Sequence, residues 1–340
     1  MTITQDNPLL QDWSAPYGLP PFSLIRPEHF APAFGEAMRQ HRAELQAIGA
    51  QATVPTFENT LAAFDRSGRL LSRIESVFYN LTASETSPAL QAVQRKMAAP
   101  LAAHSNAVYM DAALFARVDT LHQKREASSL APEQLRLLER FHLDFVRSGA
   151  RLAAAPQQRY AELMEQLAAL TTRFAQNVLH DETQHVLWLQ GAADLLGLPD
   201  FVRAAAQQAA TERGHPGGHV ITLSRSSVVP FLTFSERRDL REKAWHAWTH
   251  RGEHAGEHDN RPLVREILKL RNEQARLHGH TSYADYALTD TMAGKHAAVK
   301  GLLDEVWPRS LAAVQREHTA LREAMRAAGA SGDIEAWDWR

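Results

Sequence analysis

The chain has 340 residues, of which 44% are hydrophobic and 22% charged, and its formal net charge is −2. This balance is ordinary for a soluble globular protein and provides no bulk positive field to attract nucleic acid or anionic lipid. The absence of cysteine excludes disulfides, thiolate metal sites and cysteine nucleophiles. Because no signal-like start and no run of about 18 apolar residues occurs, we predict a cytoplasmic protein with no membrane partner.

The first third of the chain reads as helices. Pro27 suits the first turn of a helix, because its missing N–H would be unpaired there. Thr56 is a candidate N-cap for a second helix that runs to about Leu81. Ser87 and Pro88 repeat the start signal, and Pro100 should kink or divide the helix that follows.

Helical patterns continue through the middle of the chain. Pro132 opens a helix that Gly149 should end. Pro156 opens what reads as the longest helix, and its apolar stripe is predicted to be core. The residues of that stripe are Tyr160, Leu163, Leu167, Leu170, Phe174 and Val178.

Two short β-rich segments interrupt the helices, at 186–189 and 220–223. We expect them to pair in a small sheet, with a helix near 198–213 between them. Helices should then resume, at 236–251 after the candidate N-cap Ser235 and at 262–278 before Gly279. A last long helix is expected at about 297–328, interrupted at Pro308.

The expected fold class is therefore mainly α, with helices at about 27–180, a small sheet at about 185–224 and helices at about 235–328. No linker rich in glycine or proline marks a domain boundary, so residues 1–340 are predicted to form one helical region.

Histidines recur every fourth residue at His246, His250, His254 and His258. Two imidazoles at this spacing on an unbroken helix can share a metal ion, which makes His246 and His250 a candidate pair. Gly252 should end the helix before the later two histidines, and structural or exposed roles are the favoured interpretation. We therefore expect no metal bound specifically to this chain.

A zinc-peptidase H-E-x-x-H helix does not occur in the sequence. His180 and His185 enclose Asp181 and Glu182, but they are five residues apart and the glutamate does not follow the first histidine. Such a segment cannot place two ligands one helical turn apart with a glutamate beside the metal-bound water. It is predicted to be a helix end with an exposed charged turn.

Several stretches nevertheless resemble the thimet oligopeptidase and neurolysin family of zinc metallopeptidases, and within it the bacterial peptidyl-dipeptidase Dcp, with oligopeptidase A next. Their order and spacing along nearly the whole chain carry the resemblance. They are Pro27–Phe30, Pro55–Thr60, Val77–Leu81, Leu195–Pro199, Val220–Leu223, Arg241–Trp245, Leu270–Ala284 with Met292, and Trp337–Asp338.

The resemblance implies a helical fold whose two halves face a narrow channel for short peptides. It also implies zinc, held by two histidines of an H-E-x-x-H helix and a downstream glutamate. All of these groups lie C-terminal to the matched region, so no catalytic residue, cofactor-binding residue or zinc ligand of the family is assigned to this chain.

Three hypotheses follow. In the first, the chain is the N-terminal half of a zinc-dependent oligopeptidase or peptidyl-dipeptidase, supplies one channel wall, and is inactive without the missing C-terminal catalytic half. In the second, it is a natural truncated paralogue that binds peptides or a partner without catalysis. In the third, it is a helical metal-binding protein that uses His246 and His250. If the second half is missing, an uncovered apolar face should cause some self-association.

Overall fold

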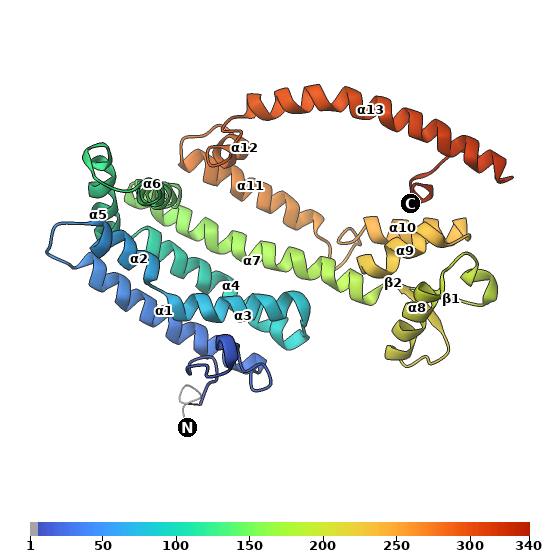
Figure 1. Cartoon of the computed structure of the whole chain (residues 1–340), viewed down its shortest axis with the longest axis horizontal. Coiled ribbons are helices and arrows are strands. Elements are labelled where there is room, and N and C mark those ends of the chain that lie inside the picture. Colours follow the sequence, from blue (N-terminus) through green and yellow to red (C-terminus); the bar gives the residue numbers. More distant parts are fainter. Residues whose placement is uncertain (1–5) are drawn as a thin grey trace. The chain divides into compact units, whose positions relative to one another are not determined.

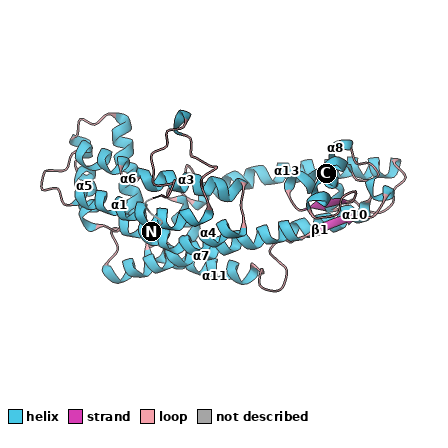
Figure 2. Cartoon of the chain, turned by 90° about the horizontal axis from the view of Figure 1, so that it is seen from below, coloured by secondary structure: helices cyan, strands magenta, loops and turns pink. Residues whose placement is uncertain are grey.

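The structure, a computed structural model, describes residues 6–340 and is built mainly of helices (Figure 1). Among these residues, the β structure is one pair of short strands, β1 (Val186–Leu189) and β2 (His219–Thr222) (Figure 2). The helices are α1 (Pro27–Gly49), α2 (Ala63–Arg66), α3 (Arg69–Ser84), α4 (Pro88–Tyr109), α5 (Ala112–Gln123), α6 (Pro132–Arg147), α7 (Ala154–Gln184), α8 (Asp200–Glu212), α9 (Arg225–Phe234), α10 (Arg238–Thr249), α11 (Arg261–Leu277), α12 (Tyr283–Leu288) and α13 (His296–Ala327). The mainly α prediction is confirmed.

The chain forms two compact units. Unit 1 contains the described part of Met1–Arg173 together with Lys269–Tyr283, and unit 2 contains Phe174–Leu268 with Ala284–Arg340. None of the helices in the described range is long and apolar enough to cross a lipid bilayer.

An aromatic core holds α1, α3 and α4 together in unit 1. Phe30 and Phe34 of α1 are fully buried, and Phe78 of α3 packs between them. The ring centroid of Phe78 lies 4.9 Å from that of Phe30 and 5.3 Å from that of Phe34, the latter in an edge-to-face arrangement. Met38 of α1 belongs to the same core, whereas Leu45 and Ile48 at the end of this helix belong to a second buried cluster.

A buried arginine ties α5 to the segment before α2. The guanidinium of Arg117 donates to the carbonyl oxygens of Gln51 (2.9 Å) and Thr53 (3.1 Å), to Asn59 Oδ1 (2.8 Å) and to Thr60 Oγ1 (3.2 Å). Only 6% of Arg117 is exposed. Because none of these acceptors is charged, the charge is stabilised by hydrogen bonds to neutral groups.

Unit 2 is organised around the small sheet. β1 and β2 pair antiparallel, with Val186 opposite Thr222 and Leu189 opposite His219. Ile221 is buried with Phe231 of α9 and with apolar residues of α8 and α10. The two strands and the helix between them were predicted, whereas α9 was not, because its Ser226–Ser227 start and internal Pro230 do not read as a helix.

Two predicted helix boundaries are wrong. The helix expected from Thr56 to Leu81 is divided at Gly68, whose φ is +68° and where a Cβ would lie 2.9 Å from the His41 ring. Thr56 does cap the first part, a π-helical segment at Phe57–Ala62. Ser235 ends α9 instead of capping the next helix, which begins at Arg238.

Two prolines do not divide their helices. In α4 the chain stays helical across Pro100, and packing of buried Met97 and Val108 on either side offsets the local cost of about 3 kcal/mol. In α13 the helix also continues across Pro308. Long helical segments flank this proline on both sides, and cooperative helix propagation favours continuity there.

The stripe of α7 is core only in its first half. Tyr160, Leu163 and Leu167 are buried, whereas Phe174 is 36% exposed. The C-terminal part of α11 covers the buried half, where Arg159 and Glu273 form a bidentate ion pair with an Nε–Oε1 distance of 2.6 Å. α7 is one residue shorter than α13, so it is not the longest helix.

Candidate functional site

Four of the histidines singled out in the sequence line a cavity in unit 2. Its volume is about 930 Å³, and its walls come from the start of β1, from α10 and from the loop that follows α10. His185, His246, His250 and His254 all line it. A cavity of this size falls within the range that holds small ligands in proteins.

His246 and His250 lie close together at the end of α10, with ring centroids 5.5 Å apart. His250 Nδ1 donates a proton to the carbonyl oxygen of His246 (2.9 Å), which leaves its Nε2 as an acceptor in the neutral form. His246 packs against Trp245 and Trp337, at centroid distances of 5.0 and 5.4 Å. The hydrogen bond of His250 and the ring packing of His246 therefore stabilise the end of α10.

The later two histidines leave the helix, as Gly252 predicts. His258 stacks on His180 with a centroid distance of 3.6 Å, and its Nδ1 donates to Asn177 Oδ1 (3.2 Å). His254 lies near His185, whose pKa is lowered first by burial and then by His254. Across residues 6–340, no three His, Asp or Glu side chains are grouped so that they could hold a metal ion. The described residues thus provide no site that fits zinc.

The acidic residues Asp181 and Glu182 at the end of α7 were predicted to form an exposed turn, and this prediction is wrong. Asp181 Oδ2 accepts a hydrogen bond from the backbone N–H of Gly252 (2.7 Å), and Glu182 pairs with Arg251. Both carboxylates are partly buried. Since Gly252 has a φ of +78°, these two acids fix the turn that carries the loop away from α10.

A second cavity, in unit 1, contains a histidine pair that the sequence did not indicate. His41 of α1 and His104 of α4 are joined by a hydrogen bond of 2.9 Å between Nδ1 and Nε2. The Ser67 hydroxyl donates to the carbonyl oxygen of Phe64 (2.7 Å), so His41 Nε2 must donate to Ser67 Oγ (3.2 Å). His104 Nε2 then donates to His41, and the tautomers of both rings are fixed.

This pair favours the neutral form of both rings. Burial, followed by the nearby His41 and Arg42, lowers the pKa of His104 to about 4, and burial lowers that of His41. The small cavity beside them, about 300 Å³, is lined largely by apolar side chains with the carboxyl groups of Asp65 and Glu75. The geometry is that of a buried neutral contact between α1 and α4.

Acidification should therefore weaken unit 1. The unfolded chain takes up a proton on His104 near pH 6.5, but the folded chain does so only near pH 4. The free energy of unfolding should fall by about 1.4 kcal/mol per pH unit in that window for this one group. Denaturant titrations between pH 7 and pH 4.5 should show a smaller slope in His104→Leu, while the exposed control His296→Leu keeps the wild-type slope. Equal slopes in all three proteins would contradict the account.

The last residues dock on α10. Asp338 accepts hydrogen bonds from Arg238 (2.8 Å) and Arg241 (2.7 Å), and its side chain is only 7% exposed. Trp337 packs on Trp245 at a centroid distance of 5.9 Å. Burial alone would raise the pKa of Asp338, but the hydrogen bonds from Arg238, the Glu335 backbone and Arg241 together lower it. The Trp337–Asp338 pair therefore anchors the terminal segment to unit 2.

Removing the negative charge of Asp338 should release the terminal segment from α10. In Asp338→Asn, we expect amide hydrogen exchange in residues 333–340 to accelerate at least about tenfold, because two arginines lose their buried partner. The matched control is Asp333→Asn, which removes a 74% exposed carboxylate that pairs with Arg322. Exchange rates that are the same in both variants would show that Asp338 does not anchor the segment.

Comparison with known proteins agrees with the resemblance. A model of peptidase family M3 matches residues 231–340. The dipeptidyl carboxypeptidases of Salmonella typhimurium and Escherichia coli are 36% and 34% identical to the chain over 98% and 99% of its length. Oligopeptidase A of Salmonella typhimurium is 30% identical over 98% of the chain. The matched regions are 49%, 50% and 49% of these relatives, so the chain spans about half the length of the curated relatives it matches. The chain belongs to peptidase family M3 and corresponds to an N-terminal half of such a protein.

Proposed function

We propose that this chain supplies the N-terminal half of a zinc-dependent oligopeptidase of the peptidyl-dipeptidase type. The assembled protein would cleave short peptides, and this half would form one wall of the substrate channel. The observation that carries the proposal is the match to dipeptidyl carboxypeptidases along almost the whole chain, at about half of their length. A location in the cytoplasm is part of the same proposal.

The chain by itself is proposed to be inactive. Family members hold zinc through an H-E-x-x-H helix, and no such motif occurs in this sequence. Zinc lowers the pKa of a bound water to produce a nucleophile at neutral pH. Among the described residues, no group of side chains fits the metal, so no step of peptide hydrolysis is assigned to a residue of this chain.

Hydrolysis of an internally quenched short peptide tests both parts of the proposal. The purified chain should give no rate above buffer, with or without added zinc. Co-expressed with the second half from the source genome, it should give hydrolysis that a chelator abolishes and zinc restores. Chelator-sensitive hydrolysis by the chain alone would overturn its inactivity, and an inactive, zinc-loaded assembly would overturn the peptidase assignment.

A non-catalytic peptide-binding module is the second candidate. The cavity beside α10 favours it, because its mixed lining of imidazoles, Lys243 and Glu242 beside apolar groups could contact a peptide backbone and both of its termini. Saturable binding of a short peptide by the isolated chain, weakened by Lys243→Ala and unaffected by Lys295→Ala, would support this function. No binding at millimolar peptide would remove it.

A further inference from the structure

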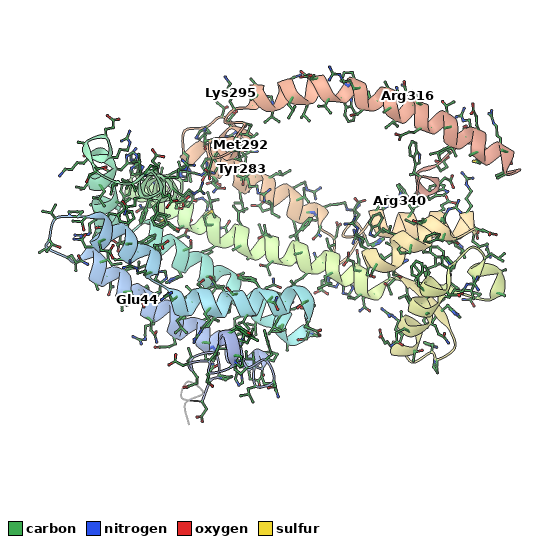
Figure 3. The ribbon with its side chains drawn as sticks, viewed as in Figure 1. Glu44, Tyr283, Met292, Lys295, Arg316 and Arg340 are labelled. Carbon is green, nitrogen blue, oxygen red and sulfur yellow. The ribbon has the colours of Figure 1, made fainter. Side chains whose placement is uncertain are left out.

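The longest helix of the chain has an uncovered apolar face. All of α13 is described, and none of its residues is buried. Six large apolar side chains in its first two thirds are 44–64% exposed: Leu302, Leu303, Val306, Trp307, Leu311 and Val314. We refer to these six residues as the α13 stripe. Figure 3 draws the side chains of this helix, with Lys295 before its first residue and Arg316 just after the stripe.

The stripe is a coherent surface. At 3.6 residues per turn, its six members fall within about half of the helix circumference. On the opposite side of the helix Glu305 contacts Arg309 (3.4 Å), and at the edge of the stripe Lys300 contacts Asp304 (2.6 Å). An apolar face opposite a charged face is typical of a helix that packs on a partner.

The last three turns of α13 contact the end of the chain. Arg322 pairs with Asp333 (2.8 Å), and the His318 ring stacks on Trp339 at a centroid distance of 6.1 Å. The α13 stripe precedes these contacts and keeps its exposure. Because most helical stability in proteins comes from tertiary packing, a helix of this length with an unburied apolar face requires another surface.

We infer that the α13 stripe is the docking surface for the second half of the peptidase, an inference that rests on the proposed function. The M3 family match covers all of α13, so the helix belongs to the part of the chain that the family model describes. The same relatives contain a second half, of similar length, that has no counterpart in this chain. That half is the occupant that the comparisons identify, and its contact surface should be largely apolar.

Co-expression of the chain with the separate second half tests this inference. The second half is taken from the source genome as the coding sequence that continues the M3 match. Wild-type chain should copurify with it in equal amounts. Leu303→Asp/Trp307→Asp, which places two charges at the centre of the stripe, should lower the recovered second half at least about tenfold. Ala312→Asp/Gln315→Asp places the same charges on the other face and should behave as wild type.

Circular dichroism of each purified chain keeps the test independent of folding, because all four positions are exposed and helix content should not change. Equal recovery with the stripe variant would overturn the inference, as would a genome that encodes no second half. Self-association that the stripe variant abolishes, without binding of the second half, would instead identify a second copy as the occupant. A complex that forms through the stripe but hydrolyses no peptide would refute the proposed function and leave the docking surface standing.

Discussion

Replacing Phe78 with alanine is expected to lower the free energy of unfolding by about 4 kcal/mol. The ring is 1% exposed and lies between Phe30 and Phe34, so its removal leaves a cavity where α1 meets α3. The aromatic contacts with Phe30, Phe34 and Tyr79 are lost together with the buried apolar area. Guanidinium chloride unfolding followed by circular dichroism measures the change.

A matched pair of variants separates packing from a general effect of losing a phenyl ring. Phe22→Ala removes a side chain that is 47% exposed and should cost less than about 1 kcal/mol. Phe78→Leu keeps most of the volume and should cost about 1.5 kcal/mol. A loss at Phe78→Ala that is no larger than the loss at Phe22→Ala would show that this core does not stabilise unit 1.

Replacing Arg117 with methionine is expected to cost about 3 kcal/mol. Methionine preserves much of the aliphatic volume but donates no hydrogen bond. The carbonyl oxygens of Gln51 and Thr53 and the side chains of Asn59 and Thr60 would each lose a charged donor. Exchange of the amides in residues 51–60 should also accelerate, because Arg117 connects this segment to α5.

Arg136→Met is the control for that measurement. Its side chain is 75% exposed and pairs with Glu139 one turn along α6, so the change should stay within about 0.5 kcal/mol. If Arg117→Met is as stable as Arg136→Met, the free energy gained from the hydrogen bonds of the Arg117 guanidinium is no larger than the cost of burying its charge.

The sequence predicted those helix ends and strands that are determined by residues within the same segment. Prolines at first turns, Gly149 and Gly279 at helix ends, and the β-rich segments around Trp188 and Val220 all lie where the structure has those features. Gly68 was missed because the close approach of the His41 ring, which leaves no room for a side chain there, comes from a residue 27 positions earlier. The chain passing helically through Pro308 shows that a single proline is a weaker signal than the long flanking pattern.

Side-chain roles that depend on distant contacts could not be predicted from the sequence. Asp181 reads as a surface charge until the fold brings the Gly252 amide to it. The same holds for His41 and His104, which are separated by 63 positions. In contrast, the histidines after Gly252 were correctly expected to leave the helix, because the glycine itself ends it. The pairing of His246 and His250 was visible from their spacing, but the tryptophans that confine His246 were not.

The most direct test of the central claim is to read the source gene beyond codon 340. We expect an open frame that continues into a helix with the pattern H-E-x-x-H and a glutamate downstream, of a length close to that of the present chain. A stop codon after Arg340, with no such coding sequence elsewhere in the genome, would contradict it and make a non-catalytic binding protein the leading interpretation.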